Sequence, residues 1–324
     1  MITIMLRRCT KMQDIRVYDF NLNLIHIENM ISSVDWVIKF NDIGTFEAHF
    51  PLNAKIVPIV MKNDYLIISQ GDNQAIVTGK SAISDFTVFG RTPNFILSKR
   101  VTPNFTKKTG TIEKISAGIV SDAFLDVENF VVKRVSGFTN EINFWRNVYN
   151  PTFKVISECL DREKAGHKVY FDFENKKWVY TAVKGRNTGI VFSKGKFNAS
   201  NTSYYEDFQE YVNGGFYEVI DEETGESIWE EIASEKEGIY KWMGVLGGNT
   251  LSDARDSLKS RKWNKNIRFD IKDMKFNKDY FLGDRVKVKT EIGDFKRYDE
   301  KYISAVNIWY ENANSGEKPV FADI

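Results

Sequence analysis

Cysteine and histidine are scarce in this sequence of 324 residues, and their scarcity removes several kinds of site. The two cysteines, Cys9 and Cys159, are too few and too far apart for a disulfide framework or a zinc knuckle. A reducing compartment during folding is the simpler interpretation. The three histidines, His26, His49 and His167, have no ligand partner at helical i, i+4 spacing and no nearby nucleophile. The sequence therefore supports no metal site, catalytic triad or bound cofactor.

Two of these residues, and one glycine-rich loop, have plain structural explanations. His49 falls on the polar face of an alternating strand pattern, so we expect it to be solvated or to make a cross-strand contact. Cys159 lies next to Leu160 in a helical pattern, where a free cysteine behaves as a small buried hydrophobe. The glycine-rich stretch 244–257 runs into a helix but lacks the lysine of a phosphate-binding loop.

Long apolar runs and a strong net charge are also missing. No apolar run approaches the roughly 20 residues that span a bilayer. At the N-terminus the basic residues follow the apolar stretch, which is the wrong order for a secretory signal. A net charge of +1 argues against bulk electrostatic binding to nucleic acid. With 42% apolar and 27% charged residues, the chain should fold around a core, without stable membrane association.

Aromatic residues are abundant, at 14%, and favour strands over helices. The segments 33–40 and 45–52 alternate apolar and polar residues and are separated by a turn that ends at Gly44. This pattern predicts a β-hairpin. A second hairpin is predicted over 65–79, turning at Gly71. The first hundred residues are therefore expected to form an antiparallel barrel or sandwich.

The middle of the chain changes to helical periodicity, in 111–124 and in 150–166. We expect Asn150 to be the N-cap of the second helix and Gly166 to end it. A hairpin predicted over 167–183 completes a small α/β module.

The last part returns to strands, at 285–292 and 302–311, with one helix in 249–263 that Thr250 should cap. The segment 221–237 holds eight acidic residues and one lysine. The apolar runs on either side of its Thr-Gly centre predict an exposed hairpin with a charged face, suited to docking.

Two further stretches are polar but lack catalytic partners. The segment 91–110 has five basic residues and no acidic one, and we interpret it as a solvated linker rather than a nucleic-acid contact. The pair Gly283 and Asp284 stands between two strand-like segments. Glycine permits a positive φ angle and aspartate can hydrogen-bond its own backbone, so the pair predicts a tight bend. No acid–base partner accompanies Asp284 in the sequence.

Four motifs occur in order along the chain. An opening strand and turn lead into a Gly-Thr-Phe hairpin, an apolar pair precedes a basic pair, a mid-chain marker spans 184–213, and an Asp-x-x-x-Gly-Asp-x-Val element closes the series. In this order they resemble the siphovirus-type tail-hub, or tail-associated baseplate, proteins of phages and related tail-like particles. The residues that carry the resemblance include Gly44, Thr45, Phe46, Arg100, Asn198, Asn213, Gly283 and Asp284.

The resemblance implies a fold of the α+β class, mostly β, with two tube-forming β-barrel-like domains and an inserted small α/β domain. The corresponding segments are 1–108, 109–188 and 189–324, the last with one helix and the acidic hairpin. It implies a non-enzymatic homotrimer whose ring closes the tail tube and adapts sixfold to threefold symmetry.

Partners implied by the resemblance are a distal tail or tail tube protein, the tape measure protein, and tip or fibre proteins, with DNA passing transiently through the lumen. The expected location is the tail tip of a virion or tail-like particle, after assembly in the bacterial cytoplasm.

Two rival hypotheses remain open. Glu230 and Glu231 could serve as the paired acids of a hydrolase that acts on cell-wall carbohydrate. Alternatively, exposed Trp229 or Trp242 could belong to a carbohydrate-binding tail module. Loss of glycan hydrolysis on Glu→Gln substitution would support the first hypothesis, and glycan binding the second.

Overall fold

The computed structural model describes residues 13–323 except 103–104, 136, 147–148, 197, 221–224, 262, 272–273 and 312–313. The chain forms two compact units. Unit 1 comprises Met1–Thr202 and Phe269–Ile324, and unit 2 comprises Ser203–Arg268. The chain enters unit 2 within β16 (Ala199–Asp207) and leaves it within β20 (Asn264–Ile271), and these two strands pair. Among the described residues, no helix is both long enough and apolar enough to cross a membrane.

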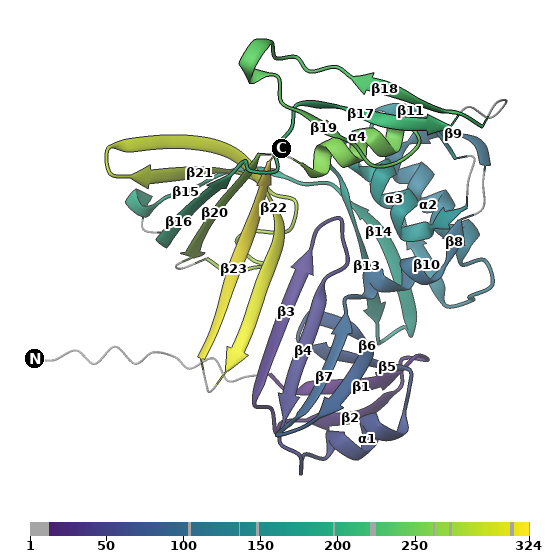
Figure 1. The fold of residues 1–324 in the computed structure, drawn as a ribbon. Helices are drawn as coiled ribbons and strands as arrows, with labels where there is room; N and C mark the ends of the chain where they lie inside the picture. The colour runs from purple at the N-terminus through teal and green to yellow at the C-terminus, as the bar shows by residue number, and fades with distance from the viewer. Residues whose placement is uncertain are drawn as a thin grey trace, which may run out of the picture. The chain divides into compact units, whose positions relative to one another are not determined.

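The protein is mostly β, and one sheet dominates unit 1 (Figure 1). Its strands run in the order β15-β21-β22-β3-β4-β7-β6-β5-β1-β2, and β23 pairs with β22 outside this path. The N-terminal strands are β1 (Ile15–Asp19), β2 (Leu24–Glu28), β3 (Ser33–Lys39), β4 (Thr45–Phe50), β5 (Leu66–Gln70), β6 (Asn73–Ala82) and β7 (Phe86–Arg91), with helix α1 (Ile56–Lys62) after β4. The C-terminal strands are β15 (Asn187–Phe192), β21 (Arg285–Ile292), β22 (Phe295–Glu311) and β23 (Asn314–Asp323).

Both predicted N-terminal hairpins are present. β3 and β4 pair antiparallel with Trp36 opposite Phe46, and these two buried rings lie 4.3 Å apart between centroids. Their burial follows the period-2 pattern of the sequence, because successive side chains of a strand point to opposite faces. β5 and β6 form the second hairpin, with Gly71 at φ 59° in the turn.

The α/β part of unit 1 is built from two helices and a small sheet in the order β10-β14-β13. The elements are β10 (Phe130–Lys133), β13 (Gly166–Asp172), β14 (Lys177–Val183), α2 (Ile112–Ala123) and α3 (Thr152–Asp161). Leu97, Val120 and Ile156 pack against Val169 and Tyr180 on one face of this sheet. The predicted helices and the hairpin over 167–183 are therefore present.

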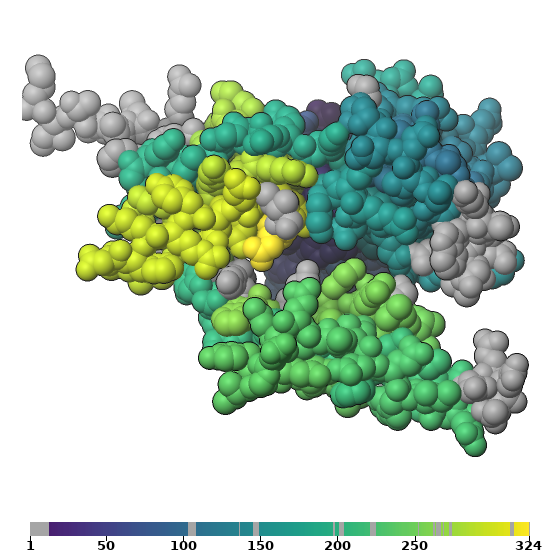
Figure 2. Space-filling model, turned by 90° about the horizontal axis from the view of Figure 1, so that it is seen from above, coloured from purple at the N-terminus to yellow at the C-terminus, as the bar shows by residue number. Residues whose placement is uncertain are grey.

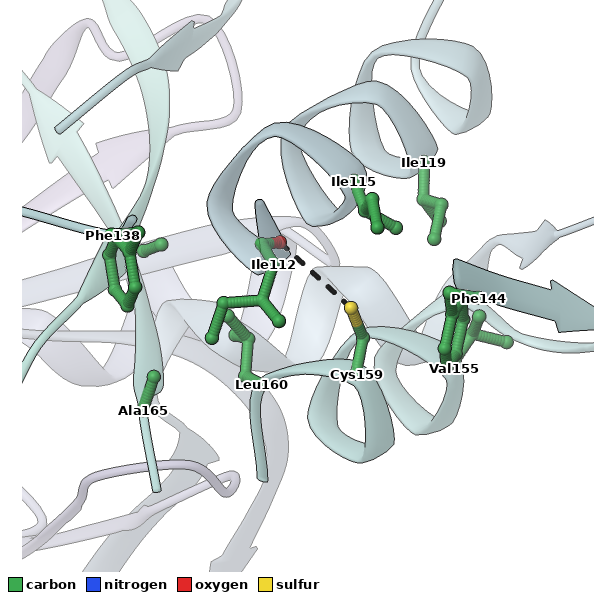
Figure 3. Close-up of a cluster of buried hydrophobic side chains, with 10 residues drawn as sticks. Ile112, Ile115, Ile119, Phe138, Phe144, Val155, Cys159, Leu160 and Ala165 are labelled. Atoms are coloured by element: carbon green, nitrogen blue, oxygen red, sulfur yellow. Dashed lines mark hydrogen bonds between the residues drawn. The ribbon is translucent and has the colours of Figure 1, made fainter. Parts of the chain in front are cut away.

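A compact apolar cluster holds α2 and α3 together (Figure 3). Ile112, Ile115 and Ile119 of α2 face Val155 and Cys159 of α3. The Cys159 thiol is fully buried and lies 3.9 Å from the Ile112 carbonyl oxygen, so the expectation of a small buried hydrophobe is confirmed. Cys9 lies outside the described residues.

Both predicted ends of the second helix are wrong. Asn150 does not cap α3, because Asn150–Pro151 form the short strand β12, which pairs with β8 (Val101–Thr102). Gly166 does not end the helix either, since α3 stops at Asp161 and Gly166 opens β13. A Cβ atom at Gly166 would lie 2.7 Å from Phe40, so its small size serves close packing.

The basic segment 91–110 is not a solvated linker. It forms the 3₁₀ helix η1 (Pro93–Lys99), β8 and β9 (Phe105–Thr111), and β9 pairs with β11 (Glu141–Arg146). The apolar residues of η1 override the basic composition, because Pro93 and Leu97 are buried in the core.

The described part of unit 2 contains a three-stranded sheet, one α-helix and the short 3₁₀ helix η3 (Gly238–Tyr240), besides the ends of β16 and β20. Its sheet runs in the order β18-β17-β19, from β17 (Gly214–Ile220), β18 (Ser227–Ile232) and β19 (Met243–Val245), and α4 (Leu251–Ser260) follows. The hairpin predicted around the acidic segment is present as β17 and β18, although 221–224 lie outside the described residues. Thr250 caps α4 as predicted, since its hydroxyl accepts a hydrogen bond from the Asp253 N–H at 3.2 Å.

Candidate functional site

A closely packed junction in unit 1 is the place where β22 changes from pairing with β21 to pairing with β3. Residues 295–302 of this long strand pair with β21, whereas 305–311 pair with β3. The Phe40 N–H donates to the Ser304 carbonyl at 2.8 Å, and the pairing of β22 with β23 shifts register between Ile303 and Ala305. β22 therefore joins the C-terminal strands to the N-terminal strands in one sheet.

Gly283 and Asp284 form the bend that leads the chain into β21 at this junction. Gly283 has a φ of +82°, which side-chain-bearing residues rarely adopt, and a Cβ atom there would lie 2.4 Å from the Phe40 ring. The Gly283 N–H donates to the Ile303 carbonyl at 2.8 Å, and the Ile303 N–H donates to the Asp284 carbonyl at 3.0 Å. The predicted tight bend is confirmed.

Asp284, by contrast, has a charged partner that the sequence analysis did not find. Its side chain is only 1% exposed, and the Arg186 guanidinium donates two hydrogen bonds to it, Nε to Oδ1 at 2.8 Å and Nη2 to Oδ2 at 2.6 Å. The Phe281 N–H donates to Oδ2 as well, at 2.8 Å. These hydrogen bonds to Asp284 raise the pKa of Arg186. A bidentate pair of this kind fixes geometry as well as charge.

The mid-chain and closing motifs therefore meet in space. A Cβ atom at Gly185 would lie 2.0 Å from the Gly283 carbonyl oxygen, so the two glycines approach backbone to backbone. The Arg285 N–H donates to the Arg186 carbonyl at 2.7 Å, beside the start of the parallel pairing of β15 with β21. The function of Asp284 here is to cross-link two chain segments.

The opening motif makes a similar backbone contact elsewhere in the sheet. Gly44 donates its N–H to the Thr92 hydroxyl at 2.8 Å, and the Thr92 N–H donates to the Gly44 carbonyl at 3.1 Å. A Cβ atom at Gly44 would lie 2.0 Å from the Val37 carbonyl oxygen. Thr45 and Phe46 then begin β4.

The remaining motif residues hold loops and ends of elements. Arg100 pairs with Asp126 at 3.1 Å and lies over the Phe124 ring. The Asn198 side chain accepts from the Ser193 N–H at 3.0 Å and donates to the Val191 carbonyl at 3.0 Å.

In unit 2 the Asn213 side chain accepts from the Trp242 N–H at 3.0 Å and donates to the Tyr240 carbonyl at 2.8 Å, both just before β19. All eight motif residues thus lie in backbone or side-chain contacts that shape the fold.

The histidines make structural contacts. His49 lies between Asp85, at 2.8 Å, and Glu47, at 2.9 Å, and contacts the Thr87 hydroxyl on the neighbouring strand β7 at 3.2 Å, so the expected cross-strand contact is present. Burial lowers the pKa of His49, but its hydrogen bonds to Asp85 and Glu47 outweigh that effect and raise the pKa overall. His167 is buried with its Nδ1 2.9 Å from the Asn41 amide oxygen, and burial lowers its pKa to about 4, so the ring is neutral at pH 7.

A cavity of about 160 Å³ in unit 1 offers room for several waters. His167, Lys168, Gln74, Asn94 and Asn277 are among its lining residues. The Gln74 and Asn94 side chains are occupied by hydrogen bonds to the backbone of β13. Within the described ranges, no three His, Cys, Asp or Glu side chains form a group that could hold a metal ion.

The proposed pair of hydrolytic acids is wrong. Glu230 lies opposite Tyr217 in the β17–β18 pairing and hydrogen-bonds to its hydroxyl, on the face that packs against α4. Glu231 is the next residue of the same strand and points to the opposite face, where it pairs with Lys241 at 2.9 Å. The two carboxylates cannot converge on one glycosidic bond.

The large sheet has two ends. β2 is the last strand on the N-terminal side, and in the described chain it pairs with β1 alone. Leu24, Ile25 and Ile27 of β2 are exposed. On the C-terminal side, β15 is the last strand of the path and pairs with β21. β23 lies outside the path and pairs with β22. Figure 2 shows the yellow C-terminal strands at the surface of the face drawn there. An exposed apolar edge strand is a template for pairing with another chain.

No protein-family model matches the sequence, and no curated protein matches it. Solved structures do match. The 43 kDa tail protein of prophage MuSo2 from Shewanella oneidensis aligns with a TM-score of 0.57 at 12% identity, over 96% of this chain and 98% of that one. The chain has the fold of a prophage tail protein.

Two further tail proteins support this fold. The tail protein from Neisseria meningitidis MC58 aligns with a TM-score of 0.56 at 10% identity, over 96% of both chains. The prophage tail protein gp18 from Listeria monocytogenes EGD-e aligns with a TM-score of 0.55 at 13% identity, over 96% of this chain and 94% of that one. The resemblance stated from the sequence motifs is confirmed as a resemblance of fold, and the tail-protein fold extends over nearly the whole chain.

Proposed function

We propose that this chain is a structural hub of a phage tail or tail-like particle, and that three copies form a ring at the distal end of the tail tube. One observation carries the proposal: β22 joins N-terminal and C-terminal strands in one sheet, whose edge strands among the described residues are β2, β15 and β23. The tail-protein fold supports the same role.

The ring would be built from two wall segments per copy. The β regions within 1–108 and 189–324 would act as the two tube-forming, barrel-like modules, with 109–188 as the α/β domain between them. The pairing of β22 with β3 favours this arrangement, because it sets strands of the two regions side by side. Three copies would then supply six segments, which adapts a sixfold tube to a threefold tip.

Closure of the ring would use the free edges. A contact between β2 of one copy and a C-terminal edge strand, β15 or β23, of the next is heterologous and generates a ring when the rotation closes. The exposed apolar side chains of β2 favour a partnered edge, since unpartnered edges are usually defended by charge or proline.

The role of the hub would be mechanical and non-enzymatic. It would receive a distal tail or tail tube protein on one side and tip or fibre proteins on the other, and it would let the tape measure protein and then DNA pass. Its place would be the tail tip of the virion or particle, after assembly in the bacterial cytoplasm.

The mass of the purified full chain in solution tests this proposal. We expect a trimer, in concentrated solution or with tail partners present, and its loss when Ile25→Lys and Ile27→Lys place charges on β2. Tyr65→Lys, at another exposed apolar position outside β2, serves as the control and should leave the trimer intact. A chain that stays monomeric under all these conditions would contradict the proposal.

A further inference from the structure

The sheet of unit 2 has one face covered by its own helix. Tyr217 of β17 is buried with Ala254 of α4 and Leu246, which follows β19. Directly opposite residues of paired strands point to the same face of a sheet. The face that contains Tyr217 is therefore the face that α4 covers.

The other face of this sheet carries large apolar side chains in the open. Phe216, Ile220, Trp229 and Val245 are 42%, 50%, 54% and 63% exposed. The register places them on one side, because Phe216 and Ile220 alternate with Tyr217, Val245 lies beside Phe216, and Trp229 lies opposite Glu218. We call these four residues the apolar face of unit 2.

Two acidic side chains lie on this face. Glu218 and Glu231 lie on the same side, held by Ser227 and by Lys241. The sequence of unit 2, 203–268, contains fourteen Asp and Glu but only eight Lys and Arg. Two copies of such a surface repel each other, so the charge favours a basic partner over a second copy of this chain.

The size of the face limits what can cover it. The three strands have seven, six and three residues, so at about 3.3 Å per residue and about 4.8 Å between strands they offer roughly 250 Å². A standard protein–protein interface buries about 800 Å² on each partner. The face is too small for a globular domain but fits one helix, and its opposite side is covered by the ten-residue α4.

We propose that the apolar face of unit 2 docks a basic amphipathic helix of a partner protein. The helix would lay its apolar stripe on Phe216 and Trp229 and direct lysine or arginine toward Glu218 and Glu231. Unit 2 would then become a sheet with a helix on each face, a common layered arrangement. This inference does not depend on the hub role, and its test is separate from the trimer measurement.

A synthetic peptide of Leu and Lys, with Leu at i, i+3, i+4 and i+7, is the probe, titrated calorimetrically into the full chain. We expect binding that weakens with salt, weakens at least tenfold for Trp229→Ser, and weakens several-fold for Glu218→Gln combined with Glu231→Gln. Tyr205→Ser is the matched control, because Tyr205 is 57% exposed in unit 2 outside this sheet, and it should leave binding unchanged.

Three results would overturn the proposal: no binding of the probe, equal binding of a scrambled peptide of the same composition, or binding that Trp229→Ser leaves unchanged. A neutral chitin oligosaccharide tests the rival ligand, and binding of it that depends on Trp229 would assign the face to sugars instead. Far-ultraviolet circular dichroism checks that each variant folds. If Trp229→Ser does not fold, Val245→Ser replaces it, with the same expected loss.

Discussion

The described residues form two three-stranded sheets whose second faces differ. In β10-β14-β13 the second face carries Lys133, Thr181 and Lys168 side by side, and Val179 on the same face is buried. In β18-β17-β19 it exposes Phe216 and Trp229. Both sheets bury an apolar first face. The need to form a core therefore does not explain why their second faces differ. An exposed apolar face of this kind is what the proposed docking of a partner helix on unit 2 requires.

Tryptophan substitutions in the two sheets should separate a covered face from an uncovered one. Trp178 of β14 is buried among Tyr18, Ile67 and Phe171, so Trp178→Ala should lower the free energy of unfolding by about 3–5 kcal/mol. Trp229→Ala should change it by less than about 0.5 kcal/mol, because that ring is exposed. Chemical denaturation of both variants measures the difference, and equal losses would break the comparison.

Ion pairs sharpen the contrast between buried and exposed positions. Asp284→Ala should lower the free energy of unfolding by about 2–4 kcal/mol, because it leaves Arg186 and the Phe281 N–H without their buried acceptor. Asp126→Ala removes the partner of Arg100 at the surface and should cost less than about 1 kcal/mol. Thermal melting followed by circular dichroism compares them. A mild effect of Asp284→Ala would show that the junction at β22 is not cross-linked as described.

Two glycines with positive φ angles, Gly283 at this junction and Gly293 in the turn between β21 and β22, test the effect of close packing. Gly283→Ala adds a Cβ atom against Phe40 as well as backbone strain, and should cost about 2 kcal/mol or more. Gly293→Ala, at φ 57° with open space around it, should cost only about 1 kcal/mol. The midpoint of urea denaturation for each variant gives the values. If the two losses are the same, the approach of Phe40 contributes nothing.

The smallest expected effect is a pH dependence at the surface of unit 1. The pKa of His49 is raised in the folded protein, so its contribution is complete below the unfolded value of 6.5 and is lost as the pH rises through the folded value. His49→Gln should therefore lower the free energy of unfolding by about 0.5 kcal/mol or less at pH 5.5 and leave it unchanged at pH 9. Urea denaturation at both pH values measures this. The difference should become smaller when Asp85→Asn is the background, because Glu47 is then the carboxylate that still holds the pKa up.

Local patterns in the sequence were sufficient to predict most of the helices and strands. The hairpin of β3 and β4, the helix α2 and the cap at Thr250 follow from period-2 alternation, period-3.6 spacing and a good N-cap residue. α3 begins later than predicted because Asn150 and Pro151 pair with β8, and that pairing is a tertiary event.

The candidate site depended on contacts that no local pattern contains. Arg186 and Asp284 are 98 residues apart, and Gly185, which precedes Arg186, is explained only by its close approach to the Gly283 backbone. The basic composition of 91–110 concealed the burial of Leu97. In the acidic hairpin, strand alternation alone would have separated Glu230 from Glu231, and it was the signal that the sequence analysis did not use.

Electron microscopy of the purified chain tests the hub proposal most directly. We predict threefold rings whose wall contains six β segments, with β2 of each copy beside a C-terminal edge strand of its neighbour. Particles that are single copies, or assemblies in which β2 remains at the outside and pairs with nothing, would contradict it.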